Sequence, residues 1–321
     1  LDWQSATREA CVDFVKNAGI VGLGGAGFPT YVKYMKPDGV DYVLINAVEC
    51  EPYITADYRS VMDDAKDLVT GAKIMKKMAE AKTVYICIKE SHPDLIEKVK
   101  SVLTDAAGVE VRPVPDVYPM GWERVLVREV LHKEYGGLPA EAGAIIGNAS
   151  SAIAIAKAFE KGEAITQKNL TVSGECVKDP HNVCVPVGMP VSEIIEACGG
   201  YTQDTVRLIS GGPMMGKAMF SLDVPAVKGL SALLCMTHDE VQDWEPSACI
   251  RCGRCVDVCP GRIIPSDLAK YAEHGNIDAF LKHDGMECCE CGCCSYVCPA
   301  KRHLTQTIAG TRKNILASKK K

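Results

Sequence analysis

Apolar and polar positions follow two different periods along the first half of the chain. Short, nearly continuous apolar runs are typical of strands buried in a parallel sheet. They occur at 42–47, 83–89, 109–115 and 143–147. Apolar positions three or four residues apart predict helices between these runs, at 6–18, 65–79, 94–104, 123–132 and 151–159. This alternation of strand and helix predicts a layered, Rossmann-like α/β domain over residues 1–165.

The pattern changes after residue 165. Shorter strands are predicted at 170–173, 183–187 and 205–210, with one brief helix at 191–197. Turn residues, among them Gly211, Gly212 and Pro213, follow these strands. We expect a separate small α+β module over residues 166–228. In the third segment, 229–321, helices are predicted from Pro265 to about residue 274 and over 276–283, so this segment is expected to be α-helical.

Composition supports a globular protein of several domains. The chain has 321 residues, about twice the usual ~150-residue domain. Hydrophobic residues make up 47% and charged residues 24%, which excludes a disordered or fibrous chain. The formal net charge of −5 supplies no basic field for nucleic acid, so no nucleic-acid partner is expected. The longest charge-free stretch, 142–156, is shorter than the ~20 apolar residues of a membrane span.

Cysteine is the residue type that departs most from an ordinary composition. The chain has 17 cysteines, and ten of them lie between Cys249 and Cys298. Thiols packed this closely are typical of metal sites in a reducing compartment, whereas a disulfide framework spreads its cysteines through a small secreted chain. The first 19 residues also lack the pattern of a signal peptide. We therefore expect a cytoplasmic protein.

The clustered cysteines form two runs with the same spacing, C-x2-C-x2-C-x3-C-P. Such runs hold [4Fe-4S] clusters, and in two-cluster ferredoxins the last cysteine of each run serves the other cluster. One cluster is then expected on Cys249, Cys252, Cys255 and Cys298. The other is expected on Cys288, Cys291, Cys294 and Cys259.

Zinc is the alternative for these cysteines. Tetrahedral zinc sites use two separated C-x2-C pairs or mixed cysteine and histidine, so four-cysteine runs supply too many close thiols. Cys289 and Cys293 add two more thiols to the second run. Starting from either one does not reproduce the spacing that ends at Cys298, so we expect both to lie near the cluster without binding it.

A glycine-rich loop precedes the first predicted strand. Residues 22–27 match G-x-G-x-x-G, and Glu49 lies 22 residues beyond Gly27. The dinucleotide fingerprint must follow a strand and enter a helix. Here a helix is predicted before the loop, and Phe28, Pro29 and Thr30 follow it. The loop could be a flexible connection, but its four glycines favour close backbone approach to a large flat or phosphorylated ligand.

Polar residues follow the first predicted strand at its carboxyl end. They are Asn46, Glu49 and Glu51. Ligands of α/β sheets bind at this edge. Taken singly, each carboxylate could equally be an exposed loop residue.

Together these features resemble the RnfC family, and the resemblance spans nearly the whole chain. It rests on the glycine loop with Phe28-Pro29-Thr30 and Lys33, the segment Asn46 to Pro52, the motif Tyr118-Pro119-x-Gly121-x-Glu123, and the two cysteine runs. RnfC is the peripheral flavin and iron–sulfur subunit of the ion-pumping Rnf complex, which connects ferredoxin to NAD. The family is similar to the NADH-oxidising flavoprotein subunit of respiratory complex I.

The resemblance implies three domains and a set of site residues. Residues 1–165 would bind FMN and NADH, 166–228 would be a β-grasp module of the soluble-ligand-binding type, and 229–321 would be a dicluster ferredoxin domain. The implied flavin residues are Gly24, Gly25, Gly27 and Phe28 in the loop, with Lys33, Asn46, Asn148 and Ser151. Glu49 and Glu51 would lie where the nicotinamide nucleotide docks.

The chain departs from its relatives at two places. Val48 stands where the complex I proteins carry aspartate. RnfC proteins also begin with a lipoyl-like barrel of about a hundred residues, and this sequence starts after the point where that barrel would end.

The implied function is electron transfer between NAD(H), FMN and two [4Fe-4S] clusters. The implied partners are the other Rnf subunits and an iron–sulfur or ferredoxin electron partner, with the chain peripheral on the cytoplasmic face of the cell membrane. One alternative is a soluble RnfC-like protein that delivers electrons from NADH to another reductase. The other is an electron wire or scaffold whose α/β domain has lost its nucleotide.

Overall fold

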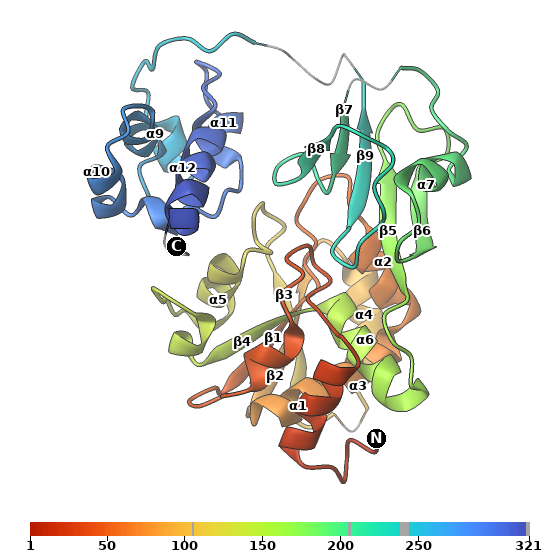
Figure 1. Cartoon of the computed structure of the whole chain (residues 1–321). Helices are drawn as coiled ribbons and strands as arrows, with labels where there is room; N and C mark the ends of the chain where they lie inside the picture. The colour runs from red at the N-terminus through yellow and green to blue at the C-terminus, as the bar shows by residue number, and fades with distance from the viewer. Residues whose placement is uncertain (105, 205–206, 238–243, 319–321) are drawn as a thin grey trace. The chain divides into compact units, whose positions relative to one another are not determined.

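The computed structural model describes residues 1–104, 106–204, 207–237 and 244–318 (Figure 1). The chain divides into two compact units, Leu1–His238 and Asp239–Lys321. The start of the strand predicted at 205–210 lies outside the described residues. The predicted domain boundaries at 165 and 228 stay predictions.

The first unit contains a four-stranded parallel sheet with the strand order β3-β2-β1-β4. Its strands are β1 (Tyr42–Asn46), β2 (Thr83–Lys89), β3 (Val109–Val114) and β4 (Ala144–Asn148). Each lies within one residue of a predicted apolar run, because strands covered on both faces are apolar along most of their length. The predicted α/β fold is confirmed.

Helices cover both faces of this sheet (Figure 1). One core contains residues of α1 (Arg8–Asn17), α3 (Ala65–Ala79), α4 (Pro93–Ser101) and α6 (Ala149–Lys161). The opposite core contains α5 (Glu123–Leu131). The sequence did not predict α2 (Ala56–Asp63) or the 3-10 helices Thr30–Tyr34 and Pro139–Ala142. At the α3–α6 crossing, a Cβ on Gly71 would lie 2.0 Å from the Ala152 carbonyl oxygen, so only glycine permits this approach.

A second, five-stranded sheet completes the first unit, with the order β6-β5-β9-β7-β8. The strands are β5 (Gln167–Ser173), β6 (His181–Pro186), β7 (Arg207–Ser210), β8 (Lys217–Met219) and β9 (Ala232–Met236). β9 is parallel to β5 and antiparallel to β7. The helix α7 (Val191–Ala197) contributes to the core on this sheet. Since β9 is central, the sheet extends beyond residue 228.

The second unit is helical over the described residues 244–318. Its helices are α8 (Arg254–Asp257), α9 (Pro265–Glu273), α10 (Ile277–Lys282), a 3-10 helix at Gly285–Glu287, α11 (Cys293–Tyr296) and α12 (Leu304–Ser318). Both helices expected between the cysteine runs are present. Leu268, Phe280 and Ile308 are fully buried in the core of this unit, which also contains Cys294, and four more of the clustered cysteines pack against it. Across the described residues, no helix is long and apolar enough to cross a membrane.

Candidate functional site

The carboxyl ends of β1 and β4 meet at the point where the chain reverses its course across the sheet. The chain runs outward from β1 to β2 and β3, then returns to place β4 on the other side of β1. Asn46 and Asn148, the last residues of β1 and β4, pair in register. Ligands of open α/β sheets bind at such a reversal. Both asparagines were predicted from the resemblance as flavin residues.

The glycine loop is fixed to the first turn of α6. The Leu23 amide donates to Ser151 Oγ at 2.9 Å, and that hydroxyl donates to the Val21 carbonyl at 3.2 Å. A Cβ on Gly24 would lie 3.0 Å from Asn148 Nδ2. The loop therefore lies beside Asn148 and Ser151, and the structure brings these predicted flavin residues together.

Two glycines of the loop have backbone angles that ordinary residues avoid. The φ angles are +107° at Gly25 and +62° at Gly27, and a Cβ at either position would meet nothing within 4 Å. The next residue, Phe28, is 46% exposed. The loop thus presents bare backbone and one aromatic ring, a surface suited to a flat ligand.

Lys168 of the second sheet also holds this loop, which the sequence did not predict. Its ammonium donates to the Leu23 carbonyl at 2.8 Å, and the residue is only 5% exposed. Burial lowers the pKa of the Lys168 ammonium, an effect opposed by the charges of Asp57 and Glu49. The two-residue alternation of a strand could have predicted that Lys168 is buried, because Lys168 falls on the same face of β5 as buried Leu170 and Val172.

Lys33 and Asn46 connect the loop region to the segment around Gly121. Lys33 Nζ donates to the Ile146 carbonyl at 2.8 Å and forms an ion pair with Glu123 at 3.2 Å. Asn46 Nδ2 donates to the Gly121 carbonyl at 2.8 Å. The predicted motif from Tyr118 to Glu123 therefore lies at the same edge of the sheet.

Glu49 caps the helix α2 from a left-handed backbone position. Its φ is +43°, and its carboxylate accepts from the amides of Asp57 at 2.8 Å and Tyr58 at 3.0 Å. Burial is the larger cause, and the negative charge of Asp57 the smaller one, of a rise in the pKa of Glu49 to about 7. Asp57 in turn accepts from Asn148 Nδ2 at 2.6 Å and Ser150 Oγ at 2.5 Å. One polar network thus joins the end of β1 to the start of α6.

Glu51 joins the two sheets of the first unit. Its carboxylate accepts from the amides of Met214 at 3.1 Å and Met215 at 2.7 Å, in the loop after β7. A Cβ on Gly212 would lie 2.3 Å from a Glu51 carboxylate oxygen, so glycine is required there. Both carboxylates predicted for the nucleotide therefore bind backbone amides.

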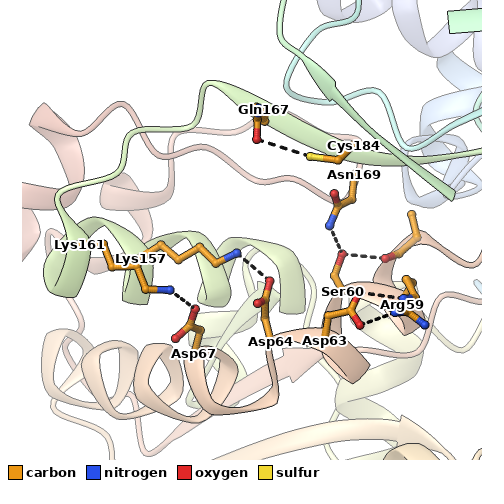
Figure 2. Close-up of polar contacts among 11 residues, drawn as sticks. Arg59, Ser60, Asp63, Asp64, Asp67, Lys157, Lys161, Gln167, Asn169 and Cys184 are labelled. Carbon is orange, nitrogen blue, oxygen red and sulfur yellow. Dashed lines mark hydrogen bonds and ion pairs between the residues drawn. The ribbon is translucent and has the colours of Figure 1, made fainter. Parts of the chain in front are cut away.

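Ion pairs fix α6 against the start of α3 (Figure 2). Lys157 pairs with Asp64 at 2.7 Å and Lys161 with Asp67 at 3.1 Å. Beside them is a cleft of about 420 Å³, whose lining includes Leu23 and Lys168. The cleft therefore lies next to the residues that hold the glycine loop.

Four predicted cluster ligands line one small cavity in the second unit. They are Cys259, Cys288, Cys291 and Cys294. Cys289 and Cys293 line the same cavity, so five cysteines of the second run lie beside the last cysteine of the first. The choice of four ligands among these six cysteines stays a prediction. Of the other predicted set, Cys249 and Cys252 are exposed, while Cys255 and Cys298 are intermediate.

Cys289 and Cys293 both form side-chain hydrogen bonds with Cys291. Their expected position near the cluster without binding it stays a prediction. Hydrogen bonds with both lower the pKa of the Cys291 thiol to about 3 and raise the pKa of the other two thiols. Among the described residues, no group of three or more His, Cys, Asp or Glu converges as ligands of a single ion would.

Three family models match successive parts of the chain. They are the Nuo51 FMN-binding domain at residues 15–157, the SLBB domain at 169–218 and the 4Fe-4S dicluster domain at 248–301. The chain is 38% identical over 317 residues to the RnfC-type subunit of the Na(+)-translocating ferredoxin:NAD(+) oxidoreductase complex of Acetobacterium woodii, covering 98% of this chain and 72% of that protein. The chain belongs to the RnfC family. The predicted resemblance is confirmed.

Other RnfC relatives show that the chain spans only part of the family's length. The matching subunit of the proton-translocating ferredoxin:NAD(+) oxidoreductase complex of Clostridium ljungdahlii is 39% identical, over 84% of this chain and 59% of its own length. That of the ion-translocating oxidoreductase complex of Erwinia tasmaniensis is 37% identical, over 88% of this chain and 36% of its own length.

Solved structures show the same fold at low identity. A subunit of the NAD+-reducing [NiFe]-hydrogenase in the H2-reduced state has a TM-score of 0.65 and 14% identity, covering 98% of this chain and 62% of the hydrogenase chain. The air-oxidised form has a TM-score of 0.59 and 18% identity, covering 97% and 54% respectively.

Proposed function

We propose that the chain transfers electrons between NAD(H), FMN and two [4Fe-4S] clusters. The observation that carries this proposal is the presence of an FMN-binding domain and a 4Fe-4S dicluster domain in one chain of the RnfC family. A hydride carries two electrons, whereas a cluster accepts one. A flavin supplies the conversion between two-electron and one-electron transfer when it is bound.

The glycine loop and the ends of β1 and β4 fit the proposed flavin site. Gly24, Gly25 and Gly27 let the backbone approach the ring system, with Phe28 beside it. Lys33 and Asn46 would supply polar groups near the ring. Ser151 holds the loop at the first turn of α6, and Asn148 accepts from the Ser151 amide in the same turn. The amides of a helix N-terminus favour an anionic group such as a phosphate.

Glu49 and Glu51 are proposed to contact the nicotinamide nucleotide while still bonded to their backbone amides. A carboxylate can accept about four hydrogen bonds. Each of these carboxylates accepts two amide bonds among the described contacts. Both side chains are consequently fixed before the nucleotide binds, which lowers the entropy lost on binding.

The clusters are proposed on the two crossed sets of cysteines. One set is Cys249, Cys252, Cys255 and Cys298. The other is Cys288, Cys291, Cys294 and Cys259, and its shared cavity supports the assignment.

The relatives' names support a role within a larger assembly. They describe one subunit of ion-translocating ferredoxin:NAD(+) oxidoreductase complexes. We propose that this chain joins the other Rnf subunits and an iron–sulfur or ferredoxin partner, and lies peripherally on the cytoplasmic face of the membrane.

An anaerobic absorbance titration with NADH tests the proposal. The chain is purified without oxygen, and flavin and iron are assayed on the same sample. We expect about one FMN, about eight irons and bleaching of the flavin followed by cluster reduction. Bound iron with no flavin and no response to NADH would contradict the proposal. It would favour the alternative in which the chain carries electrons through its clusters and the α/β domain has lost its nucleotide.

A further inference from the structure

The cavity in the second unit receives a hydroxyl group as well as cysteines. Thr305 Oγ1, in the first turn of α12, lies 3.3 Å from Cys294 Sγ. As a cluster ligand Cys294 is a thiolate, which has no proton to give. Thr305 must then be the donor in this contact.

A second hydroxyl polarises this donor. Ser295 Oγ accepts from the Thr305 amide at 2.9 Å. Its hydroxyl has two acceptors within reach, and Thr305 Oγ1 at 3.0 Å is nearer than Gln306 Oε1 at 3.3 Å. The two side chains form a relay, Ser295 to Thr305 to Cys294. Because successive hydrogen bonds polarise one another, the relay strengthens the last bond to sulfur.

In the described part of the chain, the first cysteine run has no such relay at the matching position. Cys255 corresponds to Cys294 in the repeated spacing, and the residue after it is Val256, where the second run has Ser295. Valine has no hydroxyl to donate. Ser266 lies 11 residues after Cys255, as Thr305 lies 11 residues after Cys294, but among the described residues no hydrogen bond reaches Cys255. The two runs therefore share their cysteine spacing but differ in hydrogen bonding at the third cysteine.

We propose that Thr305, polarised by Ser295, raises the reduction potential of the cluster held through Cys294 relative to the same cluster without this bond. Hydrogen bonds to ligand sulfur withdraw negative charge and stabilise the reduced cluster, which carries one more electron. Thr305 is a positioning and tuning residue, since it acts on the cluster through Cys294. This inference rests on the proposed function only in assigning a cluster to Cys259, Cys288, Cys291 and Cys294.

The test is an EPR-monitored redox titration of the full chain, purified anaerobically, with dithionite as the reductant. In Thr305→Val we expect one of the two midpoint potentials to become more negative, with iron content unchanged. Thr305→Ser, which keeps the hydroxyl, should restore the wild-type midpoint. Thr307→Val is the matched control, since the Thr307 hydroxyl bonds to the carbonyl of His303, the residue before α12.

Both midpoints unchanged in Thr305→Val at wild-type iron content would overturn the proposal. If Thr305→Val loses iron, the midpoint potentials are measured in Ser295→Ala instead. The proposal then requires a smaller negative shift in the midpoint potential of the same cluster. An unchanged midpoint in Ser295→Ala would overturn it in that case. NADH is absent from the redox titration, so this test does not depend on the proposed NADH reaction. If that reaction fails, the wild-type protein will still show two titratable clusters but will not respond to NADH in the absorbance titration.

Discussion

The glycine loop and the second cysteine run are both short segments suited to a cofactor, but they are supported in different ways. The loop is fixed by Ser151, 128 residues from Leu23, and by Lys168, 145 residues away. The second cysteine run carries five cavity-lining thiols within seven residues, and the sixth lining cysteine, Cys259, comes from the other run. The loop depends on the assembly of two sheets, whereas the run depends mainly on its own spacing.

This difference predicts that flavin and iron can be lost independently. Changes to the thiols should remove iron without affecting the loop. Changes to the loop, or to the residues that hold it, should weaken flavin binding without affecting iron. Each variant below tests one side of this separation.

The largest effect is expected from Cys252→Ser. A serine hydroxyl is a poor substitute for a thiolate ligand, so one cluster should be lost and iron should fall from about eight to about four per chain. Flavin content should stay at the wild-type level. Iron and flavin assays on the same sample measure both, and Cys184→Ser, an exposed cysteine outside the runs, is the control. Unchanged iron in Cys252→Ser would contradict the ligand assignment.

Gly27→Val should have the next largest effect, on flavin. The φ of +62° costs a side chain with a Cβ about 1–2 kcal/mol, and the added side chain occupies the surface proposed for the ring. We expect bound flavin to fall at least about tenfold, with iron unchanged.

Gly162→Val is the matched control for backbone strain. Gly162 follows α6 with a φ of +69°, and a Cβ there would also meet nothing within 4 Å. If both glycine variants lost flavin equally, general destabilisation would account for the loss and the loop assignment would fail.

The same difference explains what could be predicted from the sequence. The parallel strands were predicted within one residue at each end because continuous apolar runs are a strong local signal. The cysteine ligands were likewise predicted from spacing alone, and this assignment stays a prediction. By contrast, α12 was missed since Thr305, Thr307 and Gly310 weaken its helical pattern. The role of Lys168 could not be predicted, as its partner Leu23 is distant in sequence and only folding brings them together.

Lys168→Met tests the long-range support of the loop. Methionine keeps most of the side-chain volume but removes the donor to the Leu23 carbonyl. A hydrogen bond from a charged group contributes about 1.5–3 kcal/mol, and we expect part of this to appear as an FMN dissociation constant about tenfold higher. Flavin fluorescence titration of the deflavinated protein measures it.

Lys157→Met is the control for Lys168→Met. Lys157 lines the same cleft but pairs with Asp64, away from the loop. An FMN dissociation constant that rises equally in both variants would show that the cleft, rather than the bond to Leu23, supports flavin binding.

The smallest effect is expected from Glu49, whose network joins the two strand ends through Asp57. Its raised pKa, about 7 in the folded chain, means that folding favours the protonated form. This contribution to stability is present in full below the unfolded pKa of about 4.3 and is lost as pH rises through about 7. Between these two pH values the folded state binds more protons than the unfolded state, so the stability falls as pH rises. Glu49→Gln should remove this part of the pH dependence.

Urea unfolding of wild type and Glu49→Gln at several pH values between about 5 and 8 isolates the Glu49 contribution. Titrating groups that do not interact with Glu49 affect both proteins alike, so the difference between the two stability curves reports Glu49 and the groups coupled to it, such as Lys168. We expect wild type to lose stability relative to Glu49→Gln as pH rises. Parallel curves would show that Glu49 has the same pKa in the folded and unfolded states. Its bonds to the amides of Asp57 and Tyr58 would then offset the effect of burial on its pKa. The network would then hold the ends of β1 and β4 together independently of pH, as the ion pairs of Lys157 and Lys161 hold α6.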